Sequence, residues 1–97
     1  MKIYIAGSIT NNCDYALDFK RVEEILMEQG HTPLNPVKHL GFEYKEYIDM
    51  GLNELMHCDA ILLLNDWETS TGARLEKHYA ETVGMDIFYE SERSEGH

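Results

Sequence analysis

The segment DAILLL, residues 59–64, contains the most apolar run of the chain and decides its fold class. Its apolar part is far shorter than the roughly 20 residues that span a bilayer, and it suits a strand buried on both faces. A second apolar run, IYIA at residues 3–6, ends at Gly7 and predicts a buried first strand. Continuously apolar strands of this kind are typical of a parallel sheet covered by helices.

Outward from these runs, apolar residues recur at helical spacing. The pattern predicts helices from Asp14 to a glycine end at Gly30, over about residues 43–57, and from Ser70 or Thr71 to Gly84. Residues 31–34 and 86–89 predict two further strands. The apolar positions that carry the helical pattern are Tyr15, Phe19, Val22 and Leu26, then Tyr44, Ile48, Leu52 and Leu55, then Ala73, Ala80 and Val83.

The alternation of strands and helices predicts one flavodoxin- or Rossmann-like α/β domain over residues 1–90, followed by a polar tail at 91–97. We expect a four- to five-stranded parallel sheet with right-handed connections and helices on both faces. Ligands of such sheets bind at the carboxyl ends of the strands. The loops over residues 7–12 and 65–72 are therefore where a site is expected.

Composition excludes several classes of partner. The chain has 97 residues, with 18 Asp and Glu against 8 Lys and Arg, a net charge of −10. Such a surface disfavours nucleic acid polymers and anionic membranes, because both require basic residues. The first strand pattern starts at the second or third residue, so no signal peptide is expected and a cytoplasmic location follows.

Cysteine and histidine spacing predicts no metal or other cofactor. Cys13 and Cys58 lie 45 residues apart without a CxxC pair, which favours two reduced thiols. The histidines show no metal-ligand spacing with one another or with the cysteines.

Residues after the first strand are candidates for ligand binding. Gly7 allows a ligand to approach backbone N–H groups, and the hydroxyls of Ser8 and Thr10 can donate to a phosphate or sugar. No dinucleotide fingerprint or Walker lysine is present. The alternative is a tight turn with hydroxyl caps.

Glu76 is the candidate for chemistry in the third helix. It lies on or beside the apolar stripe of Ala73 and Ala80, near the carboxyl ends of the strands. A carboxylate buried there would have a raised pKa unless hydrogen bonds keep it ionised. The alternative is a solvated edge glutamate between Arg74 and Lys77.

The start of the same helix and the segment before it offer further candidates. Ser70, Thr71 and Gly72 can form an anion or sugar-hydroxyl site, although helix capping explains Ser70 equally well. Trp67 either stacks on a nucleobase or covers the edge of the sheet.

Three segments together resemble the nucleoside 2-deoxyribosyltransferase superfamily, and in particular a small branch of unassigned function frequent in phage genomes. They are IYIAGSI at 3–9, CDA at 58–60 and WETSTGARLE at 67–76. The spacing Ser70-x-Gly72-x-x-x-Glu76 is similar to that of the 2′-deoxynucleoside 5′-monophosphate N-hydrolases.

The resemblance implies cleavage or transfer at the N-glycosidic bond of a 2′-deoxynucleoside or its monophosphate, with Glu76 as nucleophile. It also implies a small-molecule nucleoside or nucleotide partner and assembly into a homodimer or larger homo-oligomer. By the same resemblance, the residues that bind the sugar and base are Tyr4, Gly7, Ser8 and Ile9, and those that hold the 5′ end are Ser70 and Gly72.

Gly51 departs from the family pattern. Relatives commonly carry an aspartate eight residues before Asp59, where it orients or protonates the leaving base, and this chain has Gly51 there. Asp49 lies on almost the opposite helix face, whereas Tyr47 and Glu54 are closer to the required face. If this register holds, Gly51→Asp is expected to raise activity.

Three functions stay open. Thr10 stands where the hydrolases carry a phosphate-binding Arg, which weakens the case for a monophosphate. The first hypothesis is an N-glycosidase or deoxyribosyltransferase. The alternative is a catalytically weakened module of the same fold that sequesters a nucleotide, and a third is an interaction role without a small ligand.

Overall fold

The computed structural model describes residues 1–8, 14–36 and 44–90. Their elements follow in the order β1 (Lys2–Ala6), α1 (Tyr15–Glu28), β2 (Thr32–Leu34), α2 (Tyr44–Leu55), β3 (Ala60–Leu63), the 3-10 turn η2 (Trp67–Thr69), α3 (Thr71–Val83) and β4 (Asp86–Tyr89).

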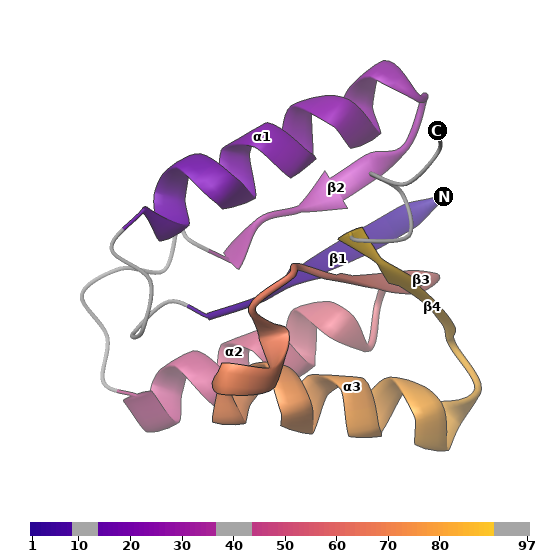
Figure 1. The fold of residues 1–97 in the computed structure, drawn as a ribbon. Helices are drawn as coiled ribbons and strands as arrows, with labels where there is room; N and C mark the ends of the chain where they lie inside the picture. The colour runs from indigo at the N-terminus through magenta and orange to yellow at the C-terminus, as the bar shows by residue number, and fades with distance from the viewer. Residues whose placement is uncertain (9–13, 37–43, 91–97) are drawn as a thin grey trace.

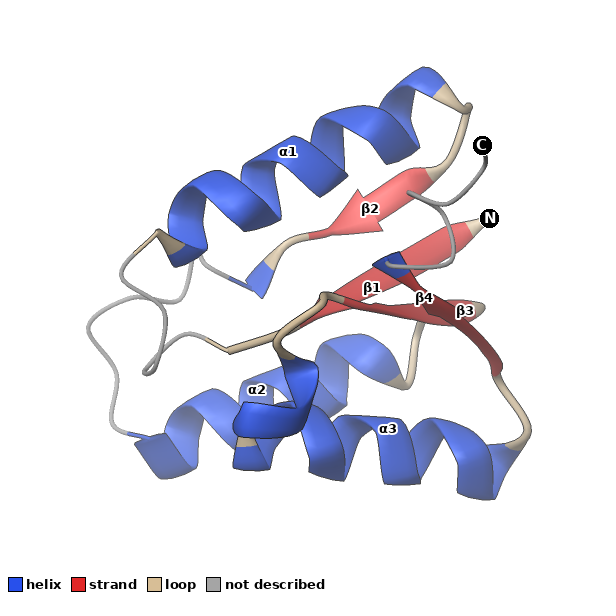
Figure 2. Cartoon of the chain, in the orientation of Figure 1, coloured by secondary structure: helices blue, strands red, loops and turns tan. Residues whose placement is uncertain are grey.

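The strands form one parallel sheet in the order β2-β1-β3-β4 (Figure 2). The predicted fold class is confirmed, with four strands. One helix end and one additional turn differ from the prediction. Helix α2 ends at Leu55 rather than His57, because the Cys58 N–H turns back to the Leu55 carbonyl at 2.9 Å. The 3-10 turn η2 has no apolar period that would have predicted it.

Helices cover both faces of the sheet: α1 lies on one face, and α2 and α3 lie on the other (Figure 1). Successive strand residues point to opposite faces. Ile3 and Ile5 therefore pack toward α1, whereas Tyr4 and Ala6 pack toward α2 and α3. This alternation places the Tyr4 side chain beneath the helix that carries the candidate carboxylate.

Glycines end two of the helices as predicted. Gly30 (φ 85°) and Gly84 (φ 80°) adopt the left-handed conformation that other residues rarely enter. The next residue then donates its N–H back into the last turn, His31 to the Leu26 carbonyl at 3.0 Å and Met85 to the Ala80 carbonyl at 2.9 Å. Each helix thereby stops where the chain must turn back into the sheet.

The topological switch point lies between β1 and β3. The chain passes from β1 to β2 on one side and then crosses to β3 on the other, so the loops after β1 and β3 diverge. The Ser8 N–H donates to Asp66 Oδ1 at 3.1 Å and ties these two loops together. None of the described helices is long and apolar enough to cross a membrane.

Candidate functional site

Glu76 lies on the face of α3 that packs against the sheet. Its exposed fraction is 8%, and Ala73 and Ala80 on the same face are almost fully buried. Of the two alternatives that the sequence left open, the structure therefore shows the buried carboxylate and excludes the solvated edge. The position follows from helical spacing, because residues three and four apart share one side of a helix.

The Tyr4 hydroxyl donates a 2.7 Å hydrogen bond to Glu76 Oε2. Tyr4 comes from the middle of β1 and is only 2% exposed. The bond joins residues 72 positions apart, one on a central strand and the other on the helix that covers it. Two of the residues predicted for the site are therefore in direct contact.

Burial dominates the electrostatics of this pair. Loss of hydration raises the pKa of Glu76 from its ordinary value of 4.5 to about 7, against the opposing effect of the hydrogen bond from Tyr4. The negative charge of Glu54 raises it further. Burial, and then the neighbouring Glu76, raise the pKa of Tyr4 well above 10, so the phenol remains protonated and acts as a donor.

Gly51 forms the wall beside this hydrogen bond. A Cβ at Gly51 would lie 2.7 Å from the Tyr4 hydroxyl and would overlap Glu76 Oε2. The predicted register of α2 is therefore confirmed, because residue 51 faces the carboxylate. The side chains of Tyr47 and Asp49, the other positions considered in this helix, lie outside the described part of the chain.

Gly7 and Ser8 occupy the loop at the switch point. A Cβ at Gly7 would lie 2.7 Å from Leu64 Cδ1, so packing against Leu64, the residue after β3, accounts for this glycine. Ser8 is 1% exposed, and its backbone N–H is held by Asp66. Ile9 and Thr10 lie outside the described residues.

Ser70 caps α3. Its Oγ accepts the Ala73 N–H at 3.1 Å, and its extended backbone is that of an N-cap residue. The capping alternative therefore explains Ser70 in this structure. Gly72 is half-buried in the first turn of the same helix.

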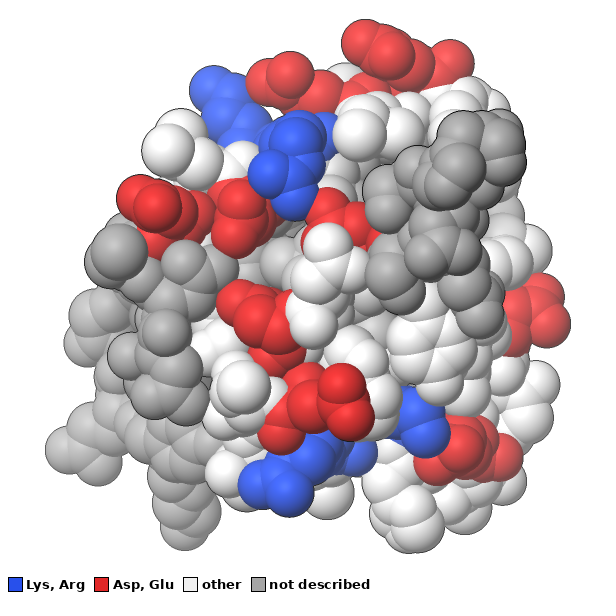
Figure 3. Space-filling view, in the orientation of Figure 1, with Lys and Arg blue, Asp and Glu red and all other residues white. Residues whose placement is uncertain are grey.

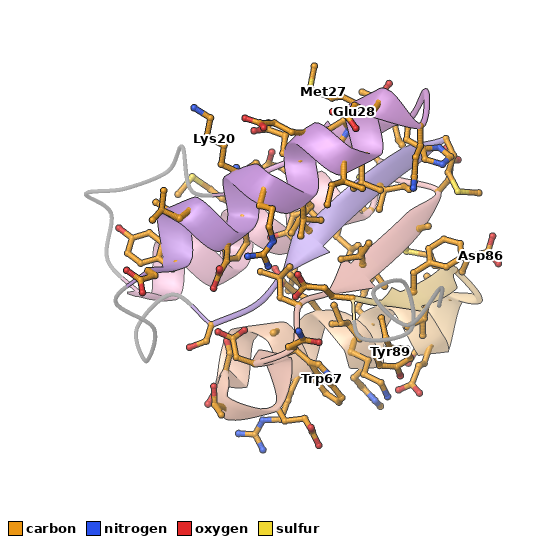
Figure 4. All side chains as sticks on the ribbon, turned by 45° about the horizontal axis from the view of Figure 1, so that its top comes forward. Lys20, Met27, Glu28, Trp67, Asp86 and Tyr89 are labelled. Carbon is orange, nitrogen blue, oxygen red and sulfur yellow. The ribbon has the colours of Figure 1, made fainter. Side chains whose placement is uncertain are left out.

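Trp67 packs at the edge of the sheet. Its ring lies 6.2 Å from that of Tyr89 at a tilt of 52°, and Lys77 Nζ lies 5.3 Å from a Trp67 ring centroid. The labelled side chains of Trp67 and Tyr89 lie next to each other in Figure 4. These contacts favour the covering role over base stacking.

Glu90 makes polar contacts that were not predicted from the sequence. It follows β4, pairs with Arg21 of α1 and accepts the Asn65 N–H at 3.1 Å. Spacing along the sequence cannot reveal a pair 69 residues apart. Across the described residues, no three His, Cys, Asp or Glu side chains gather as a metal site would require.

Comparison with solved structures identifies a related fold. The chain is similar to a 2-deoxyribosyltransferase from Leishmania mexicana, with a TM-score of 0.73, 22% identity, and coverage of 91% of this chain and 62% of that one. It thus spans less than two thirds of that protein, and the likeness is one of fold. No curated protein matches the chain. The family model of DUF4406, a domain of unknown function, matches residues 1–89, and the chain therefore belongs to that family.

Proposed function

We propose that the chain cleaves the N-glycosidic bond of a 2′-deoxynucleoside or its 5′-monophosphate, or transfers the deoxyribosyl group to another base. The observation that carries this proposal is the buried Glu76 carboxylate, which the Tyr4 hydroxyl holds at 2.7 Å. The related fold of a 2-deoxyribosyltransferase supports it. A buried, hydrogen-bonded carboxylate with a strongly perturbed pKa is a common feature of catalytic sites.

The proposed reaction consists of two displacements at C1′. Because Tyr4 holds Oε2, we assign the attack to Glu76 Oε1. The new O–C1′ bond forms as the C1′–N bond breaks, and the electron pair leaves with the base. Water, or the nitrogen of a second base, then attacks C1′ and releases the carboxylate. Two inversions retain the configuration of the sugar.

The nucleophile must be ionised to attack. Since the pKa of Glu76 is raised to about 7, the ionised fraction increases with pH through neutrality. Base release is therefore expected to rise as the pH passes about 7.

The test is chromatographic detection of free base from a panel of 2′-deoxynucleosides and their 5′-monophosphates, with and without an acceptor base. Glu76→Gln is expected to lower the rate by more than about 10³-fold, because it removes the nucleophile. Glu81→Gln is the matched control, since Glu81 is exposed on the same helix. Release at the wild-type rate by Glu76→Gln, or no release from any substrate, contradicts the proposal.

Gly51 favours a second candidate, a nucleotide-binding module with weakened catalysis. Relatives that this sequence resembles carry an aspartate at this position, whereas here the space is filled by Glu76 and Tyr4. Calorimetric titration with the same panel separates the two functions. Tight binding without base release supports the module.

A further inference from the structure

Asp66 joins the two loops that meet at the switch point. Its Oδ1 accepts the Ser8 N–H at 3.1 Å, which holds the loop after β1. Its carbonyl accepts the Thr69 hydroxyl at 2.8 Å and the Thr69 N–H at 3.1 Å, which closes the η2 turn before α3. The side chain is half-buried. One carboxylate therefore lies between the loop after β1 and the turn that leads into α3.

The donor that Asp66 occupies is of the kind that binds phosphate in α/β domains. In such domains, backbone N–H groups after the first strand and at helix N-termini commonly hold a phosphate group. Here the Ser8 N–H is paired with the Asp66 carboxylate, and the Ala73 N–H in the first turn of α3 is paired with Ser70 Oγ. Side chains of this protein thus take two donors that a phosphate could otherwise use, and the one at Ser8 is negatively charged.

The charge around Asp66 acts in the same direction. Glu68 is exposed in the same turn, and acidic side chains outnumber basic ones on the face shown in Figure 3. Arg74 is the basic residue nearest to Asp66 along the sequence. Its guanidinium is exposed and lies 3.4 Å from Thr71 Oγ1, within its own helix. Salt screens a half-buried charge such as Asp66 less than it screens an exposed one, so a phosphate that approaches these loops meets a charge of its own sign.

On the basis of the proposed function, we infer that Asp66 is a specificity-determining residue that disfavours the 5′-monophosphate and favours the unphosphorylated 2′-deoxynucleoside. It contacts Ser8, proposed to bind the sugar and base, and it lies in the segment just before Ser70, proposed to hold the 5′ end. A 5′-hydroxyl carries no charge and can donate a hydrogen bond, whereas a phosphate brings negative charge to this position. Asp66 therefore acts on the choice of substrate and not on the cleavage of the C1′–N bond.

The test is the preference of the protein between two substrates with the same base. The preference is kcat/KM for base release from a 2′-deoxynucleoside divided by kcat/KM for its 5′-monophosphate. Asp66→Asn keeps an oxygen that can accept the Ser8 N–H and removes only the charge. We expect it to lower the preference by about tenfold, the effect of one like charge in a partly screened position. The change is expected in the KM of the monophosphate, or in its inhibition constant if it is not cleaved, with kcat for the nucleoside unchanged.

Asp86→Asn is the matched control. Asp86 is an exposed residue at the start of β4, on the opposite edge of the parallel sheet, and its replacement changes the net charge by the same amount. Its preference should equal that of the wild type. Asp66→Ala removes the acceptor for Ser8 as well as the charge, so it should show the lowered preference together with a lower kcat/KM for both substrates.

Both substrates are measured on the same protein, so the preference does not depend on the fraction of molecules that is folded. A wild-type protein that prefers the monophosphate, or a preference that stays at the wild-type value in Asp66→Asn, would overturn the inference and leave the proposed function standing. Absence of base release from every substrate would remove the proposed function and the inference with it.

Discussion

Tyr4 donates to a carboxylate that burial drives toward its protonated form, and this one hydrogen bond opposes that effect. Tyr4→Phe removes the donor, so the pKa of Glu76 is expected to move above about 7. The midpoint of the pH–rate curve for base release should shift to higher pH, and the rate at pH 7 should fall. Stability should fall by about 1–3 kcal/mol, because a buried acceptor loses its partner.

Tyr79→Phe is the control for this change, since Tyr79 is a half-buried tyrosine on α3. Its pH–rate midpoint should match that of the wild type. An unchanged midpoint in Tyr4→Phe would contradict the assigned role of the hydrogen bond.

Gly51 gives the second prediction at this scale. From the sequence, Gly51→Asp is expected to raise activity by restoring an acid. The contacts around residue 51 lead us to expect the opposite result. Any Cβ at residue 51 overlaps Glu76 Oε2, so both Gly51→Asp and Gly51→Ala should displace the carboxylate. We expect lower base release and a loss of about 1–3 kcal/mol in urea unfolding.

Asn53→Ala, on the exposed side of the same helix, is the control for the effect of substitution in α2. Increased activity of Gly51→Asp would show that Glu76 can move aside and accept a second acid.

At the scale of elements, Ser70 caps the start of α3, the helix that carries Glu76. Ser70→Ala removes the acceptor for the Ala73 N–H and should cost about 1 kcal/mol. Ser70→Asp keeps an acceptor and should retain most of the stability in thermal or urea unfolding. If Ser70 also holds the 5′ end of a substrate, KM will rise in the alanine variant beyond what its lower stability explains.

Element boundaries show where local sequence was sufficient. Gly30 and Gly84 predicted two helix ends, because only a residue without a Cβ enters the left-handed conformation easily. The η2 turn between β3 and α3 was not predicted, because it depends on backbone hydrogen bonds among residues 66–70 rather than on an apolar period.

At the scale of the whole molecule, Glu76 couples stability to pH. Its folded-state pKa of about 7 exceeds the ordinary value of 4.5, so the folded state binds the extra proton between these values. The contribution of Glu76 to the free energy of unfolding is fully present below about pH 4.5. It is lost as the pH rises through about 7. The total loss is about 3 kcal/mol.

Urea unfolding of the wild type and Glu76→Gln between pH 4.5 and 8 checks this effect. The other acidic residues titrate in both proteins, so the difference isolates Glu76. A difference that does not change with pH would contradict the burial of an ionisable carboxyl group.

Assembly into a homodimer or larger oligomer is the remaining prediction at this scale, and it comes from the family resemblance. Helix α1 exposes large apolar side chains, including Leu17 at 68% and Met27 at 60%, which an interface would cover. Sedimentation equilibrium is expected to give a molecular mass of at least twice the 11.2 kDa of one chain. A single species of that mass would contradict the prediction.

The sequence by itself determined the architecture of this protein and one chemical candidate. Apolar runs at residues 3–6 and 59–64, separated by helical periods, admit few arrangements other than a parallel sheet between helices. The spacing of Glu76 with Ala73 and Ala80 set it on or beside the helix face that meets the sheet, because side chains three and four apart share a helix face. Its burial was decided by the tertiary structure.

Only the tertiary structure decided what surrounds that carboxylate. Tyr4, Gly51 and Glu76 come from a strand and two helices far apart along the chain, and packing alone brings them within contact distance. Local sequence sets which face a side chain takes, but not which partner meets it there. Packing of these three residues against one another produces the hydrogen bond from Tyr4 and the raised pKa of Glu76. It also makes the lack of a Cβ at Gly51 important.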